Sequence, residues 1–250
     1  MSDLAIPAAT VIVVREDAGA PAPELLMVER AQGMAFAGGA MVFPGGRIDQ
    51  ADRDVAAQLK LGEHGAAAVA AIRETLEETA VPIALDPLPS PAMAQLIQQA
   101  LIAEADFADL LKEHGIALRP DGLVPLARWV PKFHASRRFD TLFFIAAAPP
   151  GDWRPSVIAG ECSGAEWLTA QQVLERDRTG ETRLIFPTRR NLERLAQHGD
   201  FAAMAADAAA FPVEAITPWL EEHDGERFVT IAEGIGYPVT RERLDSLWRG

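Results

Sequence analysis

The stretch Ala66–Val81, which reads AAAVAAIRETLEETAV, has the residue pattern of an amphipathic helix. At ~100° per residue, its apolar positions fall on one stripe. That stripe consists of Val69, Ile72, Leu76 and Ala80. A continuous apolar stripe predicts that this helix packs against the core of the fold.

Three carboxylates lie on another side of the same helix, roughly 130° from the apolar stripe. They belong to Glu74, Glu77 and Glu78. Acids at i, i+3 and i+4 are neighbours on a helix surface and repel one another, so the cluster is unfavourable unless a positive group lies against it. Arg73 neutralises only part of this charge. A hard divalent cation such as Mg²⁺ would complement the acidic face, and the alternative is an ordinary solvated surface.

The composition excludes several classes of protein. The 250 residues are 49% hydrophobic and 24% charged, as in an ordinary globular protein. The formal net charge of −13 argues against broad binding of nucleic acids or anionic membranes, because both depend on excess Lys and Arg. The single cysteine, Cys162, excludes an internal disulfide and is interpreted as structural. Without a basic leader or a long apolar run, we expect a cytoplasmic protein.

Strand-like segments lie on both sides of the acidic helix. Ala9–Arg15 and Glu24–Glu29 are apolar runs separated by a turn-rich segment, which predicts a hairpin. Ala35–Pro44 leads into Gly45-Gly46, which predicts a tight turn or a close approach of a ligand to the backbone. The later strand candidates are Leu123–Phe133, Phe139–Ala147 and Ser163–Leu168.

Helical patterns occupy much of the remaining chain. The connector Arg47–Gly65 contains a short helix, and Pro91–His114 forms one or two helices with a break near Asp106. Further helices are predicted at Ala170–Arg176, at Pro187–His198, where Pro occupies the first turn, and at the end of the chain at Arg241–Trp248. Arg189 and Arg190 are interpreted as surface residues of their helix or as partners for the acidic excess.

Two separated motifs now agree in order. Phe43-Pro44-Gly45-Gly46, a connector and then RETLEE at Arg73–Glu78 resemble the Nudix box, G-x5-E-x7-R-E-U-x-E-E-x-G-U, in which U is apolar. The resemblance implies an α/β fold, a Nudix-type α/β/α sandwich with a mixed central sheet and helical insertions. We expect one domain over 1–250, with a core at about 9–198, an insertion at 53–65 in the box, a helical insertion at 91–115 and a C-terminal extension at 199–250.

The box departs from the pattern in three places. Asp52 stands at the first acidic position, and Arg73 follows it by 21 positions where the pattern has eight, so 13 residues are inserted. Asp52 or Glu63, or neither, would then supply the first acid. Ala80 stands where the pattern has its second Gly, and Thr75 where it has an apolar residue.

Interrupted boxes of this kind are similar to those of the subgroup related to a peroxisomal coenzyme A diphosphatase of animals. The resemblance covers about Ala9–Ala196 and includes ARWVPKFHASRRFDTLFF and PTRRNLERLA. It implies coenzyme A or an acyl-coenzyme A as substrate. However, the signature R-x3-G-x3-FPGG is met at Gly39 but not at Ala35, where relatives have Arg. ADP-ribose, NADH and nucleotide sugars therefore stay open as alternatives.

What the resemblance implies is hydrolysis of the diphosphate linkage of a nucleoside diphosphate derivative, with Mg²⁺ or Mn²⁺ as cofactor. Glu74 and Glu78 would hold the metal, and the backbone carbonyl of Gly46 could add a ligand. Glu77 would complete the metal site or orient the attacking water. Arg73 would hold one of these glutamates in place.

A general base could come from a later loop, as in other members of the family. Glu161 is the first candidate because it lies in a glycine-flanked loop before a strand, and Glu166 and Asp140 are the next candidates. Each of the three could equally be an ordinary surface acid.

Three basic residues between two strand candidates match the oxygens of a substrate phosphate, and the alternative is that they are solvated strand-end charges. They are Lys132, Arg137 and Arg138. The expected partner is a small nucleoside diphosphate substrate, not a nucleic acid or a membrane, and a homodimer stays open. The rival hypothesis is a Nudix-fold nucleotide-binding or regulatory protein without hydrolytic activity.

Overall fold

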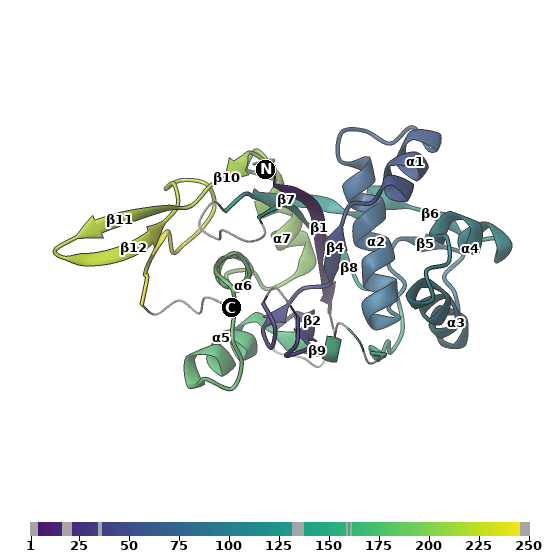
Figure 1. Cartoon of the computed structure of the whole chain (residues 1–250), viewed down its shortest axis with the longest axis horizontal. Helices are drawn as coiled ribbons and strands as arrows, with labels where there is room; N and C mark the ends of the chain where they lie inside the picture. Colours follow the sequence, from purple (N-terminus) through teal and green to yellow (C-terminus); the bar gives the residue numbers. More distant parts are fainter. Residues whose placement is uncertain are drawn as a thin grey trace.

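The computed structural model describes residues 5–16, 22–34, 37–131, 138–158, 160 and 162–245. Its centre is a mixed sheet with the strand order β10-β7-β8-β1-β2-β3, in which β4 also pairs with β1 and β9 with β2 (Figure 1). These strands are β1 (Ile6–Arg15), β2 (Glu24–Arg30), β3 (Met41–Val42), β4 (Gly45–Arg47), β7 (Val124–Trp129), β8 (Phe139–Ala147), β9 (Cys162–Thr169) and β10 (Ala215–Ile216).

The predicted hairpin of β1 and β2 is confirmed, with Val14 opposite Leu25 in an antiparallel pair. On its other side β1 runs parallel to β8, so that Val11 lies opposite Phe144. Successive side chains of β1 alternate between the two hydrophobic cores, with Val11 and Ile12 in different ones. The apolar run in β1 is therefore continuous because both faces of this strand are covered.

Helices cover both faces of the sheet and make it the middle layer of an α/β/α sandwich, as expected (Figure 1). On one side are α1 (Gln50–Gln58), α2 (Gly65–Thr79), α3 (Pro91–Ile102) and α4 (Phe107–Glu113). On the other side are α5 (Ala170–Thr179), α6 (Phe186–Leu195) and α7 (Phe201–Ala209). Short elements β5 (Leu85–Asp86), β6 (Ala117–Leu118) and the 3₁₀ turn η1 (Pro120–Gly122) complete the α2 side. None of the helices in the described ranges is both long and apolar enough to cross a bilayer.

The apolar stripe of α2 packs into the core as predicted, because Val69, Ile72 and Leu76 are fully buried. The helix ends at Ala80, which is also buried and adopts the left-handed conformation with φ 55°. Glycine is favoured at such a position, which fits the glycine that the Nudix pattern has there. The break predicted near Asp106 is also confirmed, since α3 ends at Ile102 and the Asp106 side chain caps the start of α4.

Gly45 and Gly46 do not form the turn that was one of the two predictions. They belong to β4, in which Gly46 lies opposite Ala9 and Gly45 opposite Thr10 of β1. A Cβ atom on Gly45 would lie 2.3 Å from the carbonyl oxygen of Ala9. This close approach leaves no room for a side chain, so glycine is needed at position 45 for β4 to pair with β1.

The end of the chain differs from the prediction. Arg241–Arg243 is a strand, β13, in a three-stranded antiparallel sheet with β11 (Trp219–His223) and β12 (Glu226–Thr230), which extends away from the central sheet in Figure 1. The predicted helix is wrong at these residues because Val229 of β12 pairs with Glu242 and fixes a period of two. Leu244 and Asp245 form a turn, and the rest of that prediction, 246–248, lies outside the described residues.

Candidate active site

The two halves of the motif meet in space where α2 packs against β4. A Cβ atom on Gly46 would lie 2.5 Å from the carboxyl carbon of Glu74. One residue earlier, the backbone N–H of Gly45 donates to Oε2 of Glu78 at 3.0 Å. The carboxylates of α2 thus lie directly on the glycine backbone of FPGG, which explains why side chains are absent there.

Arg73 lies at the centre of a group of acids. Its guanidinium makes a two-pronged contact with Asp52, with Nε 3.0 Å from Oδ1 and Nη2 2.9 Å from Oδ2. Nη1 donates to Glu74 at 2.8 Å and lies 3.6 Å from Oε2 of Glu77. Nη2 lies 3.6 Å from Oδ2 of Asp49. Burial opposes the charge of Arg73, but the bonds to Asp52 and the charge of Glu74 outweigh it and raise the pKa of the guanidinium. Arg73 therefore stays charged and contacts Glu74, and its role in holding a glutamate in place stays a prediction.

Asp52 lies directly before the insertion in the box. It belongs to the first turn of α1, which continues into the insertion, and it is only 1% exposed. Its Oδ2 also accepts from the backbone N–H of Asp49 at 2.9 Å. Asp52 therefore stands in the site as the partner of Arg73. Glu63, the other candidate for the first acid, is exposed.

Glu78 is 9% exposed and has a partner on each carboxylate oxygen. Oε2 accepts from Gly45, and Oε1 accepts from the thiol of Cys162 at an S–O distance of 3.6 Å. Burial raises the pKa of Glu78 to about 8, and the negative charge of Glu74 adds to the rise. The bond from Gly45 and the charge of Arg30 act in the opposite direction.

Burial and neighbouring charges also act in opposite directions on the pKa of Glu74. Burial raises its pKa to about 7, Arg73 lowers it, and the charge of Glu77 raises it further. Glu78 is buried and Glu74 is partly buried, and an additional positive charge would favour the ionised form of both carboxyl groups. The donor set, carboxylate oxygen beside backbone, suits a hard cation such as Mg²⁺ or Mn²⁺.

Within the described ranges, no three His, Cys, Asp or Glu side chains are already grouped so that they could hold a metal ion. Mg²⁺ in proteins usually takes one or two carboxylates and completes its coordination with water and substrate phosphate. Glu77 is the most accessible of the three acids of α2, since 31% of its side chain is exposed. Its roles as a metal ligand or as the group that orients water stay predictions.

The candidate bases have different surroundings. Glu161, the first candidate, lies outside the described residues. Glu166 accepts two bonds from Arg176, at 2.5 and 3.2 Å. Asp140 accepts two bonds from Arg128, at 2.7 and 2.6 Å. Each of these two acids is thus engaged by an arginine of its own, as expected of a surface ion pair.

The candidate phosphate-binding residues precede β8. Lys132 and Arg137 lie outside the described residues. The backbone carbonyl of Arg138 accepts from the N–H of Ile6 at 2.8 Å, which fixes the start of β8 beside β1. Arg30, at the end of β2, was not predicted, although its charge acts on Glu78. Its sequence signal is weak, because one basic residue at a strand end has no distinguishing context.

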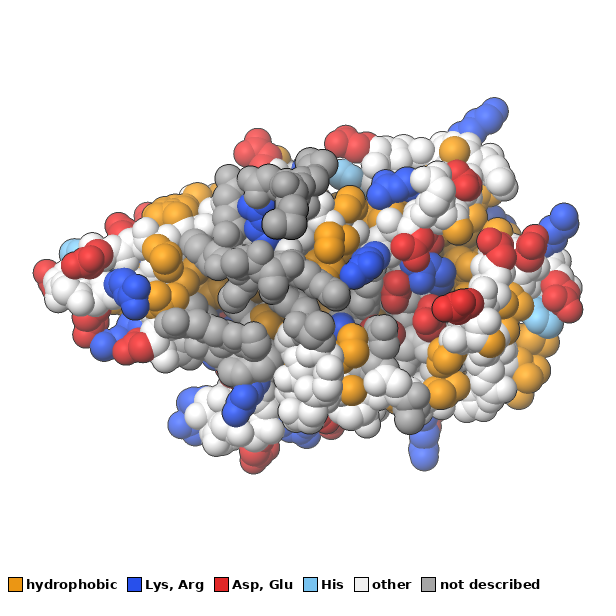
Figure 2. Space-filling model, in the orientation of Figure 1, with side chains coloured by type: hydrophobic (Ala, Val, Ile, Leu, Met, Phe, Trp, Pro, Cys, Tyr) orange, Lys and Arg blue, Asp and Glu red, His pale blue; other side chains and the backbone are white. Residues whose placement is uncertain are grey.

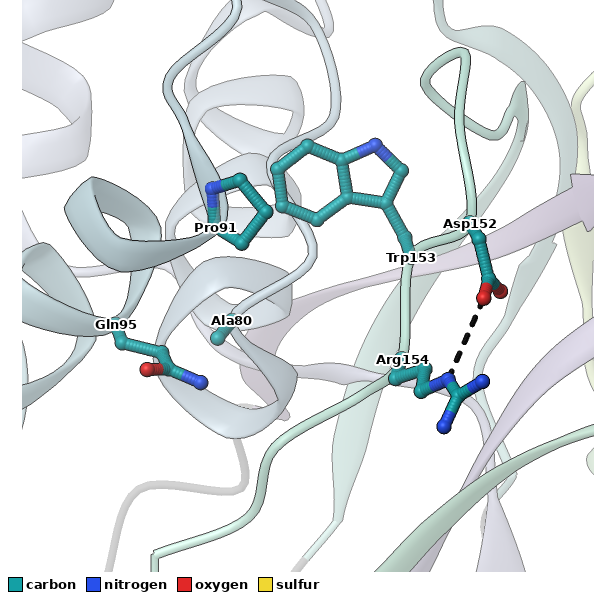
Figure 3. Close-up of a pocket in the computed structure, with 6 residues that line it drawn as sticks. All are labelled: Ala80, Pro91, Gln95, Asp152, Trp153 and Arg154. Atoms are coloured by element: carbon teal, nitrogen blue, oxygen red, sulfur yellow. Dashed lines mark hydrogen bonds and ion pairs between the residues drawn. The ribbon is translucent and has the colours of Figure 1, made fainter.

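The surface shows where ligands could reach the chain. Acidic and basic side chains gather on the visible surface near α1 and α2 (Figure 2). A hollow of about 220 Å³ lies at the C-terminal end of α2, where Pro91, Trp153 and Arg154 surround Ala80 (Figure 3). A second hollow, of about 180 Å³, is bordered by Gly38–Gly39 and Gly180–Arg183. Neither is lined by Glu74 or Glu78, so the acidic cluster itself defines the candidate site.

A solved structure shares this fold. A NUDIX hydrolase from Alicyclobacillus acidocaldarius matches with a TM-score of 0.69 and 28% identity, over 81% of this chain and 96% of that chain. The NUDIX domain of Shewanella oneidensis NrtR, solved with ADP ribose, matches with a TM-score of 0.46 and 14% identity, over 78% and 88% of the two chains. No family model matches the sequence. The chain thus has the fold of the NUDIX hydrolase from Alicyclobacillus acidocaldarius.

Proposed function

We propose that this protein is a metal-dependent hydrolase that cleaves the diphosphate linkage of a nucleoside diphosphate derivative. The observation that carries the proposal is the pair Glu74 and Glu78, buried on α2 against the glycines of β4. The similarity to the NUDIX hydrolase of A. acidocaldarius supports hydrolysis in general. We retain a cytoplasmic location and leave a homodimer open.

The residues of the site have separate tasks in this proposal. Glu74 and Glu78 hold Mg²⁺ or Mn²⁺, and Arg73 keeps Glu74 in position because Asp52 anchors the guanidinium. When bound, the cation neutralises diphosphate oxygens and lowers the pKa of a bound water. Glu77, the most exposed acid of α2, orients the attacking water.

The reaction needs one water molecule and no other reactant. The water oxygen forms a bond to one phosphorus, the bond between that phosphorus and the bridging oxygen breaks, and two phosphate-terminated products leave. A carboxylate accepts the proton of the water. Glu161 stays the first candidate for this role, and Lys132, Arg137 and Arg138 stay candidates for binding the phosphates.

Coenzyme A or an acyl-coenzyme A is the substrate we propose first. Its support is the interrupted box and the segments that resemble the coenzyme A diphosphatase subgroup. Ala35 in place of the signature Arg weakens that support. ADP-ribose, NADH, nucleotide sugars and dinucleoside polyphosphates belong in the same test.

A substrate screen tests the function directly. The purified protein is incubated with each compound in Mg²⁺, in Mn²⁺ and in EDTA, and the phosphate-terminated products are separated and identified. We expect metal-dependent cleavage of at least one compound at its diphosphate. No cleavage of any compound, combined with measurable binding of one, would favour the nucleotide-binding protein instead.

The variant Glu78→Gln tests the site. It keeps the size of the side chain and an oxygen that accepts from Gly45, but it removes the charge that holds the cation. We expect loss of nearly all metal-dependent turnover with an unchanged circular dichroism spectrum. Glu175→Gln is the matched control, because Glu175 pairs with Arg178 on the exposed surface of α5. Wild-type turnover by Glu78→Gln would exclude this assignment of the site.

A further inference from the structure

A β-bulge in β9 turns Cys162 towards α2. In the pairing of β2 with β9, Glu29 lies opposite Gly164 and Arg30 opposite Cys162, so Ser163 is an extra residue. Regular alternation from Trp167, which packs against the α2-side core, would turn residue 162 to the other face. The bulge reverses this direction, and bulges often re-aim a side chain next to a functional site.

The re-aimed thiol contacts one of the proposed metal ligands. Cys162 is 5% exposed, and its Sγ lies 3.6 Å from Oε1 of Glu78. The other oxygen, Oε2, accepts from the N–H of Gly45 at 3.0 Å. The two donors belong to two different strands, Gly45 to β4 and Cys162 to β9. A carboxylate held at both oxygens has a fixed plane, and its remaining lone pairs point in set directions.

A thiol is suited to this task because it is neutral. Arg73 orients Glu74 but also cancels part of the negative charge that a cation needs. Cys162 can donate to Glu78 as a weak neutral donor and leaves the charge of the carboxylate intact. The site thus contains two kinds of support, a charged one for Glu74 and a neutral one for Glu78.

We propose that Cys162 is a positioning residue, whose thiol fixes the orientation of Glu78 for cation binding. The inference rests on the proposed function, because it takes Glu78 as a metal ligand. It also gives the bulge at Ser163 a purpose, since a regular strand would leave Oε1 of Glu78 without this donor.

Direct titration with Mn²⁺, followed by electron paramagnetic resonance without substrate, tests the inference. Cys162→Ser keeps a donor, whereas Cys162→Ala and Cys162→Val remove it, and Val also fills the space. We expect the two variants without a donor to bind Mn²⁺ about 10-fold more weakly, as is typical when a partner of a metal ligand is removed. Cys162→Ser is expected to stay within about 2-fold of the wild type, because its hydroxyl can make the same bond.

Ser163→Ala is the matched control for the bulge. Its hydroxyl donates to the backbone carbonyl of Glu29 at 3.3 Å, on the other side of the bulge from the thiol contact. We expect it to bind Mn²⁺ like the wild type, and melting curves confirm that each variant is folded. Wild-type affinity in Cys162→Ala or Cys162→Val, or equal weakening in Cys162→Ser, would overturn the inference alone. No Mn²⁺ binding by the wild type would overturn the proposed function as well.

Discussion

Two groups of buried and partly buried charged side chains lie on opposite faces of the central sheet, and they differ in the ratio of carboxylates to guanidiniums. The first, the acidic group, consists of Asp52, Arg73, Glu74, Glu77 and Glu78 on the α2 side. The second, the clamp group, consists of Asp177, Arg189, Arg190, Glu193 and Glu242 on the α6 side. In the acidic group one guanidinium lies within 3.6 Å of four carboxylates, if neighbouring Asp49 is included.

In the clamp group the relation is reversed, because one carboxylate serves two guanidiniums. Glu242 of β13 accepts from both Arg189 and Arg190 of α6. Arg190 also pairs with Glu193 at 2.9 Å, and Arg189 with Asp177 at 2.6 Å. Arg190 is 2% exposed, so the prediction of a surface position for it is wrong, whereas the alternative of a partner for acids is confirmed.

The difference separates a structural role from a functional one. The clamp group joins β13 to α6 and contains two guanidiniums for three carboxylates. The acidic group contains one guanidinium for four carboxylates. Burial raises carboxyl pKa values in both groups, at Glu74 and Glu78 in one and at Asp177 and Glu193 in the other, so the excess of carboxylates is what differs. Burial of charge is therefore common to both groups. The excess of negative charge in the acidic group is what points to a positively charged ligand.

The largest effect is expected from Glu242→Ala in the clamp group. Removing the carboxylate leaves two guanidiniums without their shared partner, and breaking a buried pair in this way costs about 3–5 kcal/mol. Urea unfolding measures the free energy of unfolding of the variant and of the control Glu222→Ala, which changes an exposed residue of β11. If both variants lose the same small amount, the clamp group does not stabilise the fold.

A smaller effect of opposite sign is expected in the acidic group. In metal-free buffer Glu78→Gln should raise the free energy of unfolding by about 1–2 kcal/mol, since functional sites often hold destabilising groups. The reason is that the folded wild type must either keep a negative charge on Glu78 beside Glu74 or take up a proton there, whereas Gln does neither and retains the Gly45 contact. Mg²⁺ should then raise the Tm of the wild type but not of the variant. A variant less stable than the wild type would show that the acidic group is compensated after all.

The smallest effect concerns pH and Glu193. Burial raises the pKa of Glu193 to about 7, while Arg190 opposes the rise and Glu242 adds to it. Between about pH 4.5 and 7 the folded state then binds more protons than the unfolded state, so stability falls as pH rises through this window. Tm should fall between pH 5 and pH 8, and we expect this fall to be a few degrees smaller in Glu193→Gln than in the wild type. Glu74 and Glu78 contribute the same sign, so a residual slope is expected. An identical slope in the variant would contradict this account.

Much of the fold could be predicted from the sequence because its signals are periodic. The stripe of α2 and the apolar runs of β1 and β2 report directly which faces are buried. The site was predictable as far as FPGG and RETLEE are concerned, because both halves lie on regular elements that pack together. Their contact at Gly46 needed the structure, since sequence shows spacing and not the approach of a carboxylate to a backbone.

Other features depend on register and could not be predicted. Cys162 reaches Glu78 only because a bulge changes the direction of its side chain, and no sequence pattern marks that bulge. Asp52 reaches Arg73 because α1 folds back on α2, which the count of inserted residues does not show. Arg241–Arg243 forms a strand because it pairs with β12, and the local sequence pattern does not show this pairing.

The way α1 returns to α2 places the turn between these helices away from Arg73. Asp52 near the start of α1 meets Arg73, whereas the turn from Leu59 to Glu63 lies at the far end of the helix pair. Lys60 and Gly62 in that turn are exposed, and a Cβ on Gly62 would touch nothing within 4 Å. The turn is therefore a suitable place to attach a fluorescent label or a short peptide, which would report on the protein without entering the candidate site.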